Sequence, residues 1–350
     1  MAALPIPRPT ASQTNAEHLT ASAHTNPGVA ALVQWGKRYP AVLPLPSAQS
    51  TPILVGVAYS AGADSTALLM AAHHLWPGQV VALHVHHGLQ AAADTFEVLG
   101  RQVCAQHGID WRVQHVDARN QPGGSPEAAA RHARYRALAT MASHAGVSVV
   151  LLGQHADDQA ETLLLALSRG SGLPGLSAMP ERFERHGTVF ARPLLTLTSA
   201  SLRDWVCQAG HTFVDDPSNT DERLTRNRIR AKLMPAWDAC FPTFRAQLAR
   251  SALHAAEAQS LLDELAATDL AQVGVPPVLK ALQTLRRERQ ANVLRYWLRH
   301  SHGVAPSTAQ LTALLDQVAA CRTRGHHIHL KVAGGFVTRC GATLCYTPPI

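Results

Sequence analysis

The chain has few charged side chains, no paired-cysteine pattern and no long apolar run, and each absence excludes a class of protein. Charged residues make up 16% of the 350 residues and hydrophobic residues 46%, so the chain is too apolar to be disordered. Its six cysteines form no C-x-x-C pair, which argues against a zinc ribbon or a disulfide-stapled secreted scaffold. No stretch approaches roughly 18 uninterrupted apolar residues, and prolines interrupt the N-terminus, so we expect neither a membrane span nor a signal peptide. A folded cytoplasmic protein without a membrane partner is the expectation.

The charge balance is basic, although the total charge content is low. Lysine and arginine number 31 against 24 acidic residues, which leaves a formal net charge of +7. Such an excess favours a polyanionic partner, but it is equally compatible with ordinary surface charge. The 20 histidines would add positive charge below about pH 6.5 and do not by themselves indicate a function.

The length favours two domains, and the residue pattern divides the chain accordingly. Residues 1–27 are rich in alanine, proline, serine and threonine without periodicity, so we predict a disordered tail. Four apolar, β-branched runs follow, at 53–59, 80–85, 111–116 and 147–152. Each run precedes a segment with helical spacing, at 65–75, 92–107, 126–144 and 157–168. This alternation predicts an α/β domain over 28–234 with a doubly wound, mostly parallel, Rossmann-like sheet.

The remainder of the chain changes character. We predict a helix over 199–209, a basic helix over 221–234, and then a smaller, mainly helical α+β domain over 235–350. Alternating residues at 327–332 and 335–346 predict a terminal hairpin. Because ligands of parallel sheets bind beyond the carboxyl ends of the strands, functional residues are expected just after Tyr59, Val85, Val116 and Leu152.

The loop after the first strand has the composition of a phosphate site. It consists of Ser60, Ala61, Gly62, Ala63, Asp64, Ser65 and Thr66, between an apolar strand and a helix. Backbone N–H groups, hydroxyls and the positive helix end suit an anion, whereas Asp64 is better suited to Mg²⁺. The loop is neither a Walker A motif nor a dinucleotide fingerprint. A simple serine or aspartate helix cap is the alternative.

Two further segments are ambiguous alone. His84-Val85-His86-His87-Gly88-Leu89 follows the second strand; its imidazoles could simply face solvent, and a metal site would need a third ligand that the local spacing does not supply. Arg131 and Arg134 lie three apart on a helix, which suits phosphate oxygens or a solvated face.

An acidic patch follows the fourth strand. Asp157, Asp158 and Glu161 fall on the first turns of one helix, directly after His155. A capping role accounts for Asp157, because acids suit helix N-termini, but it does not account for all four residues.

The loop at 60–65 resembles the S-G-G-x-D-S pyrophosphate loop of the N-type ATP pyrophosphatases, the PP-loop superfamily. Ala61 departs from that pattern at the first glycine, and a positive φ there would cost about 1 kcal/mol. Together with the other segments, the chain resembles the tRNA(Ile)-lysidine synthetase family over roughly residues 30–234. The matching segments are 60–65, 84–89, 127–135, 155–172, 192–195, 216–219 and 226–227. The segment at 285–319 is similar to the family's smaller substrate domain.

The resemblance implies an enzyme that uses ATP and free L-lysine to convert the wobble cytidine of the isoleucine tRNA with a CAU anticodon to lysidine. It implies ATP binding by residues 60–66, Mg²⁺ binding by Asp64, and phosphate contact by Arg131 or Arg134. Lysine binding is expected from Asp157, Asp158 and Glu161, with His155, Asp158 or Glu161 as proton acceptor. The tRNA contacts expected on this basis are Arg226, Asn227, Arg228 and Arg230. A second basic helix carries Arg286, Arg287, Arg289, Arg295 and Arg299, and is either a further tRNA face or a solvated one. The oligomeric state stays open, with a homodimer as one option.

Two alternatives remain to be weighed. A tRNA-thiolating enzyme of the same superfamily would need a persulfide-bearing cysteine or a cluster-binding set near the sheet edge, whereas Cys104 and Cys207 fall inside helical patterns. A nucleotide-binding module without catalysis would explain Ala61, but it leaves the acidic helix unexplained.

Overall fold

The computed structural model describes residues 26–46, 53–86, 92–116, 126–216, 221–323 and 325–349; at 92–93 and 126–128 it describes the backbone alone. The first 25 residues of the expected tail and the motif positions 87–89 and 217–219 lie outside this range. Contacts divide the chain into two units, Met1–Ala252 and Leu253–Ile350. The division falls inside helix α11 (Phe244–Val273), beyond the boundary expected at residue 234.

The first unit contains a six-stranded sheet in the order β3-β2-β1-β4-β6-β5. Its strands are β1 (Val55–Ala58), β2 (Val80–His86), β3 (Asp110–His115), β4 (Val149–Leu151), β5 (Arg182–Arg185) and β6 (Thr188–Ala191). All neighbouring pairs are parallel except β5 with β6. The predicted mostly parallel sheet is therefore confirmed, and the sequence missed only the short antiparallel edge hairpin, which lies in a segment without regular spacing.

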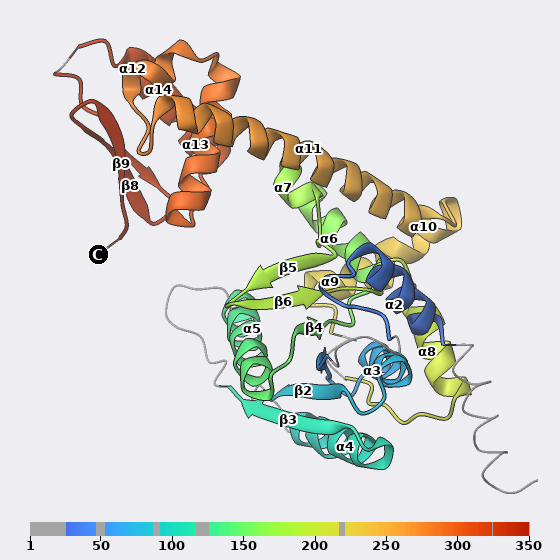
Figure 1. Ribbon diagram of the computed structural model, residues 1–350. Coiled ribbons are helices and arrows are strands. Elements are labelled where there is room, and N and C mark those ends of the chain that lie inside the picture. The colour runs from blue at the N-terminus through green and yellow to red at the C-terminus, as the bar shows by residue number, and fades with distance from the viewer. Residues whose placement is uncertain are drawn as a thin grey trace, which may run out of the picture. The chain divides into compact units, whose positions relative to one another are not determined.

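Helices alternate with the strands as expected. They are α2 (Pro27–Arg38), α3 (Ala63–Leu75), α4 (Ala92–His107), α5 (Pro126–Ala145), α6 (Ala156–Ser168), α7 (Leu173–Leu176) and α8 (Ser199–Gln208). Figure 1 shows α4 and α5 on opposite sides of the β2–β3 edge. This arrangement brings the ends of β1, β2 and β4, each followed by a candidate motif, to one edge of the sheet.

Two hydrophobic cores hold the layers together, one on each face of the sheet. On one face, buried residues of α2, α3 and α8 pack with Val55 and Val57 of β1. On the other, Tyr135 and Leu138 of α5 pack against Val81, among others. Since strands buried on both faces read as continuous apolar runs, this packing explains why β1, β2 and β4 were recognisable from the sequence.

The predicted basic helix over 221–234 is wrong in its start and its regularity. The chain forms α9 (Thr225–Arg228), a π-helical turn (Ile229–Leu233) and α10 (Met234–Cys240). Asp221 instead makes a turn in which its carboxylate accepts from the Arg223 backbone and guanidinium, while Asn227 donates to its carbonyl. These local bonds compete with helix formation and delay it to Thr225.

The second unit is mainly helical, as expected. It contains most of α11, then α12 (Leu279–Thr284), α13 (Arg287–His302) and α14 (Thr308–Ala320), and strands β7 (His329–Val332), β8 (Gly335–Cys340) and β9 (Thr343–Thr347). The predicted two-stranded hairpin is wrong, because the structure has three strands in the order β7-β8-β9. Gly341, with φ +65°, reverses the chain inside the second predicted strand and divides it into β8 and β9. None of the helices described is both long and apolar enough to cross a bilayer.

Candidate active site

The loop after β1 leads directly into the N-terminus of α3. Gly62 is the N-cap residue, and no side chain of the described residues caps the helix. The Ser65 and Thr66 hydroxyls both donate to the Gly62 carbonyl, at 3.0 and 2.9 Å, and Ser60 Oγ lies 3.1 Å from Ser65 Oγ. Since these hydroxyls fold the loop and leave the first helical N–H groups uncapped by side chains, the loop has the geometry of an anion cradle.

Ala61 carries the backbone strain that its position in the motif suggested. Its φ is +62°, in the left-handed region, and its side chain is fully buried. The Ala61 carbonyl accepts a hydrogen bond from the Val214 backbone at 2.9 Å, so the segment after α8 holds the loop in this conformation. An alanine there costs about 1 kcal/mol relative to an unstrained residue.

Helix α6 begins directly beside this loop. A Cβ built on Gly153, which follows β4, would lie 3.4 Å from the Ser65 backbone, so the two segments are in van der Waals contact. Ser199 at the start of α8 donates to Asp64 Oδ1 at 3.0 Å and, through its backbone, to Asp157 Oδ2 at 2.8 Å. The acidic helix and the loop therefore form one site, as their positions after adjacent strands predict.

His155 lies at the centre of the carboxylates. Its Nε2 is 3.4 Å from both Asp64 Oδ2 and Asp158 Oδ2, and its Nδ1 is 3.5 Å from Asp157 Oδ2. Burial alone would lower the pKa of this imidazole, but the three carboxylates outweigh burial and raise the pKa of His155 to about 10. His155 is therefore protonated at neutral pH and cannot accept another proton.

Both carboxylate oxygens of Asp157 are in contact with cationic or hydrogen-bond donor groups. Arg245 Nε donates to its Oδ1 at 2.5 Å, from a helix 88 residues along the chain, and Ser199 and His155 contact its Oδ2. Burial would raise the pKa of Asp157, but His155, Ser199 and Arg245 together hold it well below its usual range. Asp157 is thus a permanently charged anchor for α6.

Glu161 and Asp158 share a cation. Arg230 Nε donates to Glu161 Oε1 at 2.7 Å, and Arg230 Nη2 lies 3.4 Å from Asp158 Oδ1. The Glu161 side chain is only 1% exposed, and burial raises its pKa despite the opposing charge of Arg230. The pair therefore already accommodates one cationic side chain. Arg230 directs its guanidinium to this acidic pair, and its expected contact with tRNA stays a prediction.

The histidines of β2 lie at the neighbouring strand end. His84 is buried and its Nδ1 donates to the Tyr59 carbonyl at 2.9 Å, immediately before the loop. Burial lowers the pKa of His84, so the imidazole is neutral, which suits a donor to a carbonyl. The expectation that these imidazoles simply face solvent is wrong for His84 and His86, because α4 and β3 cover them.

The remaining candidates occupy more open positions. Arg131, in the first turns of α5, is exposed and lies over the Tyr135 ring at 5.8 Å. Arg228 is exposed on α9, and its guanidinium lies 3.3 Å from the Thr225 hydroxyl. Both side chains are open to solvent.

Sequence reasoning missed Ser199, Arg245 and Arg192 as parts of the site. Arg192 is buried and donates to Gln154, Tyr135 and the Pro180 carbonyl, which ties β6 to the chain just before His155. For Arg192, the available sequence signal was its place in the matching segment 192–195. For Ser199 and Arg245 the sequence contained no such signal.

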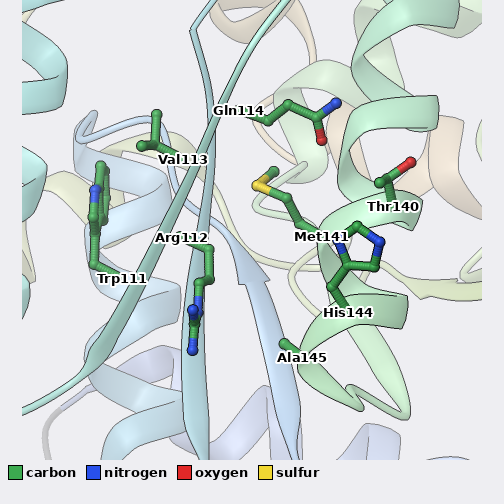
Figure 2. Close-up of a pocket in the computed structure, with 8 residues that line it drawn as sticks. All are labelled: Trp111, Arg112, Val113, Gln114, Thr140, Met141, His144 and Ala145. Carbon is green, nitrogen blue, oxygen red and sulfur yellow. The ribbon is translucent and has the colours of Figure 1, made fainter.

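A separate cavity lies away from this site. It has a volume of about 400 Å³ and opens between β3 and α5. Figure 2 shows that strand and helix side chains line it, with Met141 and Gln114 among them. None of the predicted site residues lines this cavity.

The donor set fits a magnesium ion. Asp64 is one-third exposed, and its oxygens and those of Asp158 converge on one protonated imidazole nitrogen. Mg²⁺ is commonly held by one or two carboxylates together with substrate phosphates and water, and Asp64, beside the phosphate loop, offers such a ligand.

Family models match both units. Residues 43–237 match a PP-loop domain, and residues 278–340 match the TilS substrate binding domain. The tRNA(Ile)-lysidine synthase of Polaromonas naphthalenivorans is 63% identical over 302 residues, covering 86% of this chain and 91% of that protein. The enzyme of the same name from Burkholderia pseudomallei is 44% identical over 291 residues. The match covers 81% of this chain and 59% of that protein.

A solved structure shows the same fold at lower similarity. The U34-tRNA thiolase NcsA from Methanococcus maripaludis, with its [4Fe-4S] cluster, is 14% identical and superimposes with a TM-score of 0.51 over 64% of this chain and 79% of that one. At this identity the likeness concerns the fold alone. By its family matches and its close relatives, the chain belongs to the tRNA(Ile)-lysidine synthase family.

Proposed function

We propose that the chain ligates free L-lysine to carbon 2 of the wobble cytidine in the isoleucine tRNA with a CAU anticodon. In the first step, oxygen 2 of the cytosine attacks the α-phosphate of ATP and pyrophosphate leaves. In the second step, the lysine ε-amine attacks carbon 2, loses a proton, and oxygen 2 leaves with AMP. The products are lysidine, AMP and pyrophosphate.

In the first step the protein's contribution is position and charge. The uncapped N–H groups of α3 and the hydroxyls of Ser60, Ser65 and Thr66 would bind the departing pyrophosphate. Arg131, at the same edge of the sheet, would offset phosphate charge. Mg²⁺, when bound, would be held by Asp64 and would neutralise part of the triphosphate charge.

The second step needs a neutral amine. The lysine side chain has an ordinary pKa near 10.4, so having it neutral at pH 7 costs about 4.6 kcal/mol. Asp158 and Glu161 would first hold the ammonium, because the cationic Arg230 guanidinium occupies the same pair of carboxylates. Arg230 would give way to the substrate.

Glu161 is the better candidate for the proton acceptor. His155 is already protonated at neutral pH, and the pKa of Asp157 is held well below its usual range. Burial instead raises the pKa of Glu161 and makes it a stronger base than an exposed carboxylate. Asp157 and His155 would then position α6 and Asp158.

Substrate tRNA would meet the basic turn before α10. Arg226, Asn227 and Arg228 belong to α9, and Arg228 is exposed. Contacts between such side chains and phosphates add affinity that weakens with salt.

The observation that carries the proposal is the pairing of Asp158 and Glu161 around a cation, beside the phosphate loop. The test is to incubate the full chain with ATP, lysine and isoleucine tRNA and to identify the wobble nucleoside by mass spectrometry. We expect a lysine adduct that requires ATP. Absence of the adduct at saturating ATP and lysine, or sulfur incorporation when a sulfur donor replaces lysine, would overturn the proposal.

A further inference from the structure

A second cluster of ligating side chains lies at the β2–β3 edge, on the α4 side of the sheet. His84 and His86 alternate along β2 and so share one face. The parallel register places His86 directly opposite His115 of β3. His84 stacks on Trp111 and His86 lies beside His115, with ring centroids 5.1 and 4.5 Å apart.

Helix α4 adds a carboxylate to this pair of imidazoles. Gly100 of α4 sits against the Trp111 ring, where a Cβ would come within 2.6 Å, and this close approach brings the preceding turn over the strand ends. Glu97, in that turn, places its Oε2 3.3 Å from His115 Nε2. The ligand atoms of His86, Glu97 and His115 all lie within 4.8 Å of one another.

The burial of the three side chains suits a site with one open position. The His86 side chain is 8% exposed and that of Glu97 16%, whereas His115 is 64% exposed. The inner two ligands are therefore held by packing, and solvent reaches the cluster from the His115 side. Zinc sites with three protein ligands and a bound water have this character.

The ion pairs in the cluster do not by themselves explain its composition. Arg101 donates to Glu97 Oε1 at 2.8 Å, and His86 Nε2 lies 3.0 Å from Asp94 Oδ1. Each acid thus has a partner without the second imidazole, yet His86 and His115 lie side by side. Two neighbouring imidazoles repel each other when both are protonated, but together with a carboxylate they are a favourable ligand set for a transition metal.

We propose that His86, Glu97 and His115 form a binding site for Zn²⁺. The ion would join the carboxyl ends of β2 and β3 to α4, three elements that are also linked by side-chain packing, strand hydrogen bonds and the contacts of His86 with Asp94 and of His115 with Glu97. Asp94, one helical turn before Glu97 and already in contact with His86, is available to bind as a further ligand or to orient the imidazole. Since imidazole nitrogens favour Zn²⁺ and Mg²⁺ prefers oxygen, this site is chemically distinct from the one at Asp64.

The test measures Zn²⁺ binding by the full chain, purified without a histidine tag and freed of metal with a chelator. Titration of zinc chloride in competition with a chromophoric indicator should show one tight equivalent in the wild-type chain. Both His115→Ala and Glu97→Gln should weaken that binding at least tenfold. Magnesium chloride in excess should not displace the ion, and Zn²⁺ should raise the thermal unfolding midpoint of the wild type but not of Glu97→Gln.

A matched control uses histidines that cluster elsewhere. His73, His107 and His211 have neighbouring rings, 6.2 and 5.5 Å apart, but this trio is not a ligand group with a carboxylate. His107→Ala should therefore keep wild-type Zn²⁺ affinity. The proposal is overturned if the wild type binds no tight equivalent, or if Glu97→Gln and His115→Ala, shown to be folded by circular dichroism, bind Zn²⁺ as tightly as His107→Ala.

Discussion

The first unit contains a cluster of acids and the second unit a single buried acid, and the two differ in how completely cations neutralise them. In the second unit, Asp269 of α11 is fully buried and receives two hydrogen bonds from Arg289, one of them at 2.8 Å. In the first unit, Asp64, Asp157, Asp158 and Glu161 surround His155, Arg230 and Arg245. Asp238 also forms an ion pair with Arg245, so among these described residues the acids outnumber the cations.

The difference separates a structural ion pair from a functional cluster. A single acid with a bidentate arginine has its charge and lone pairs satisfied, and breaking it mainly costs stability. A cluster with surplus carboxylate retains attraction for another cation, such as an ammonium or a metal ion.

The same contrast applies to the basic helices. On α13, Arg287 pairs with Asp316 at 2.6 Å and Arg299 lies 3.5 Å from Asp263, so acids neutralise much of its expected basic face. The positive charge toward tRNA is therefore expected from α9.

The strongest test of the comparison is Glu161→Gln. Removing this carboxylate should slow lysidine formation at saturating lysine by about 100-fold or more, because the proton acceptor is lost, while pyrophosphate release in the first step continues. Quantifying both products in one time course checks this. Glu181→Gln, which alters an acid paired with Arg38 outside the site, is the control and should leave both rates unchanged. A wild-type rate for Glu161→Gln would remove Glu161 from the mechanism.

The converse change is Asp269→Asn. It places an amide against the Arg289 guanidinium in a fully buried position, so the thermal unfolding midpoint should fall by several degrees while turnover per folded molecule is retained. Asp316→Asn, at a pair whose aspartate is 63% exposed, should change the midpoint far less. Loss of turnover in folded Asp269→Asn would contradict the division between the two groups.

A smaller effect is expected on tRNA affinity. Arg228→Ala should reduce the slope of log affinity against log salt by about 1, since it removes one phosphate contact. Arg287→Ala removes a guanidinium that Asp316 already neutralises, so its slope should match the wild type. Filter binding of isoleucine tRNA at several potassium chloride concentrations measures both, and equal slopes for all three proteins would refute the assignment to α9.

The smallest expected effect concerns strain. Ala61→Gly relieves a positive φ and should raise the free energy of unfolding by up to about 1 kcal/mol, part of the gain being offset by the more flexible unfolded chain. Ala333, in the turn before β8, has φ +52°, so Ala333→Gly should stabilise the chain similarly. Chemical denaturation measures both, and only Ala61→Gly is expected to change ATP affinity. A destabilised Ala61→Gly would show that the loop does not store strain.

Much of the architecture followed from the sequence. The apolar runs and helical spacings placed four strands and the four following helices within a few residues of their observed bounds, because buried strands require apolar runs and helices packed on one face require apolar residues three and four apart. The loop at 60–66 and the acidic residues at 157–161 were also recognisable, since phosphate and cation sites need particular residue types next to each other. Even the strain at Ala61 followed from its motif.

Only the tertiary structure decided which distant side chains meet. Arg230 reaches Glu161 across 69 residues and Arg245 reaches Asp157 across 88, and no local pattern encodes either contact. The sequence likewise did not indicate that Glu97 and His115 lie near His86. Their proximity depends on the register of β2 with β3 and on the packing of α4 against these strands. Residue types and short-range spacing are properties of the sequence, whereas charge neutralisation and ligand geometry depend on how strands and helices align after packing.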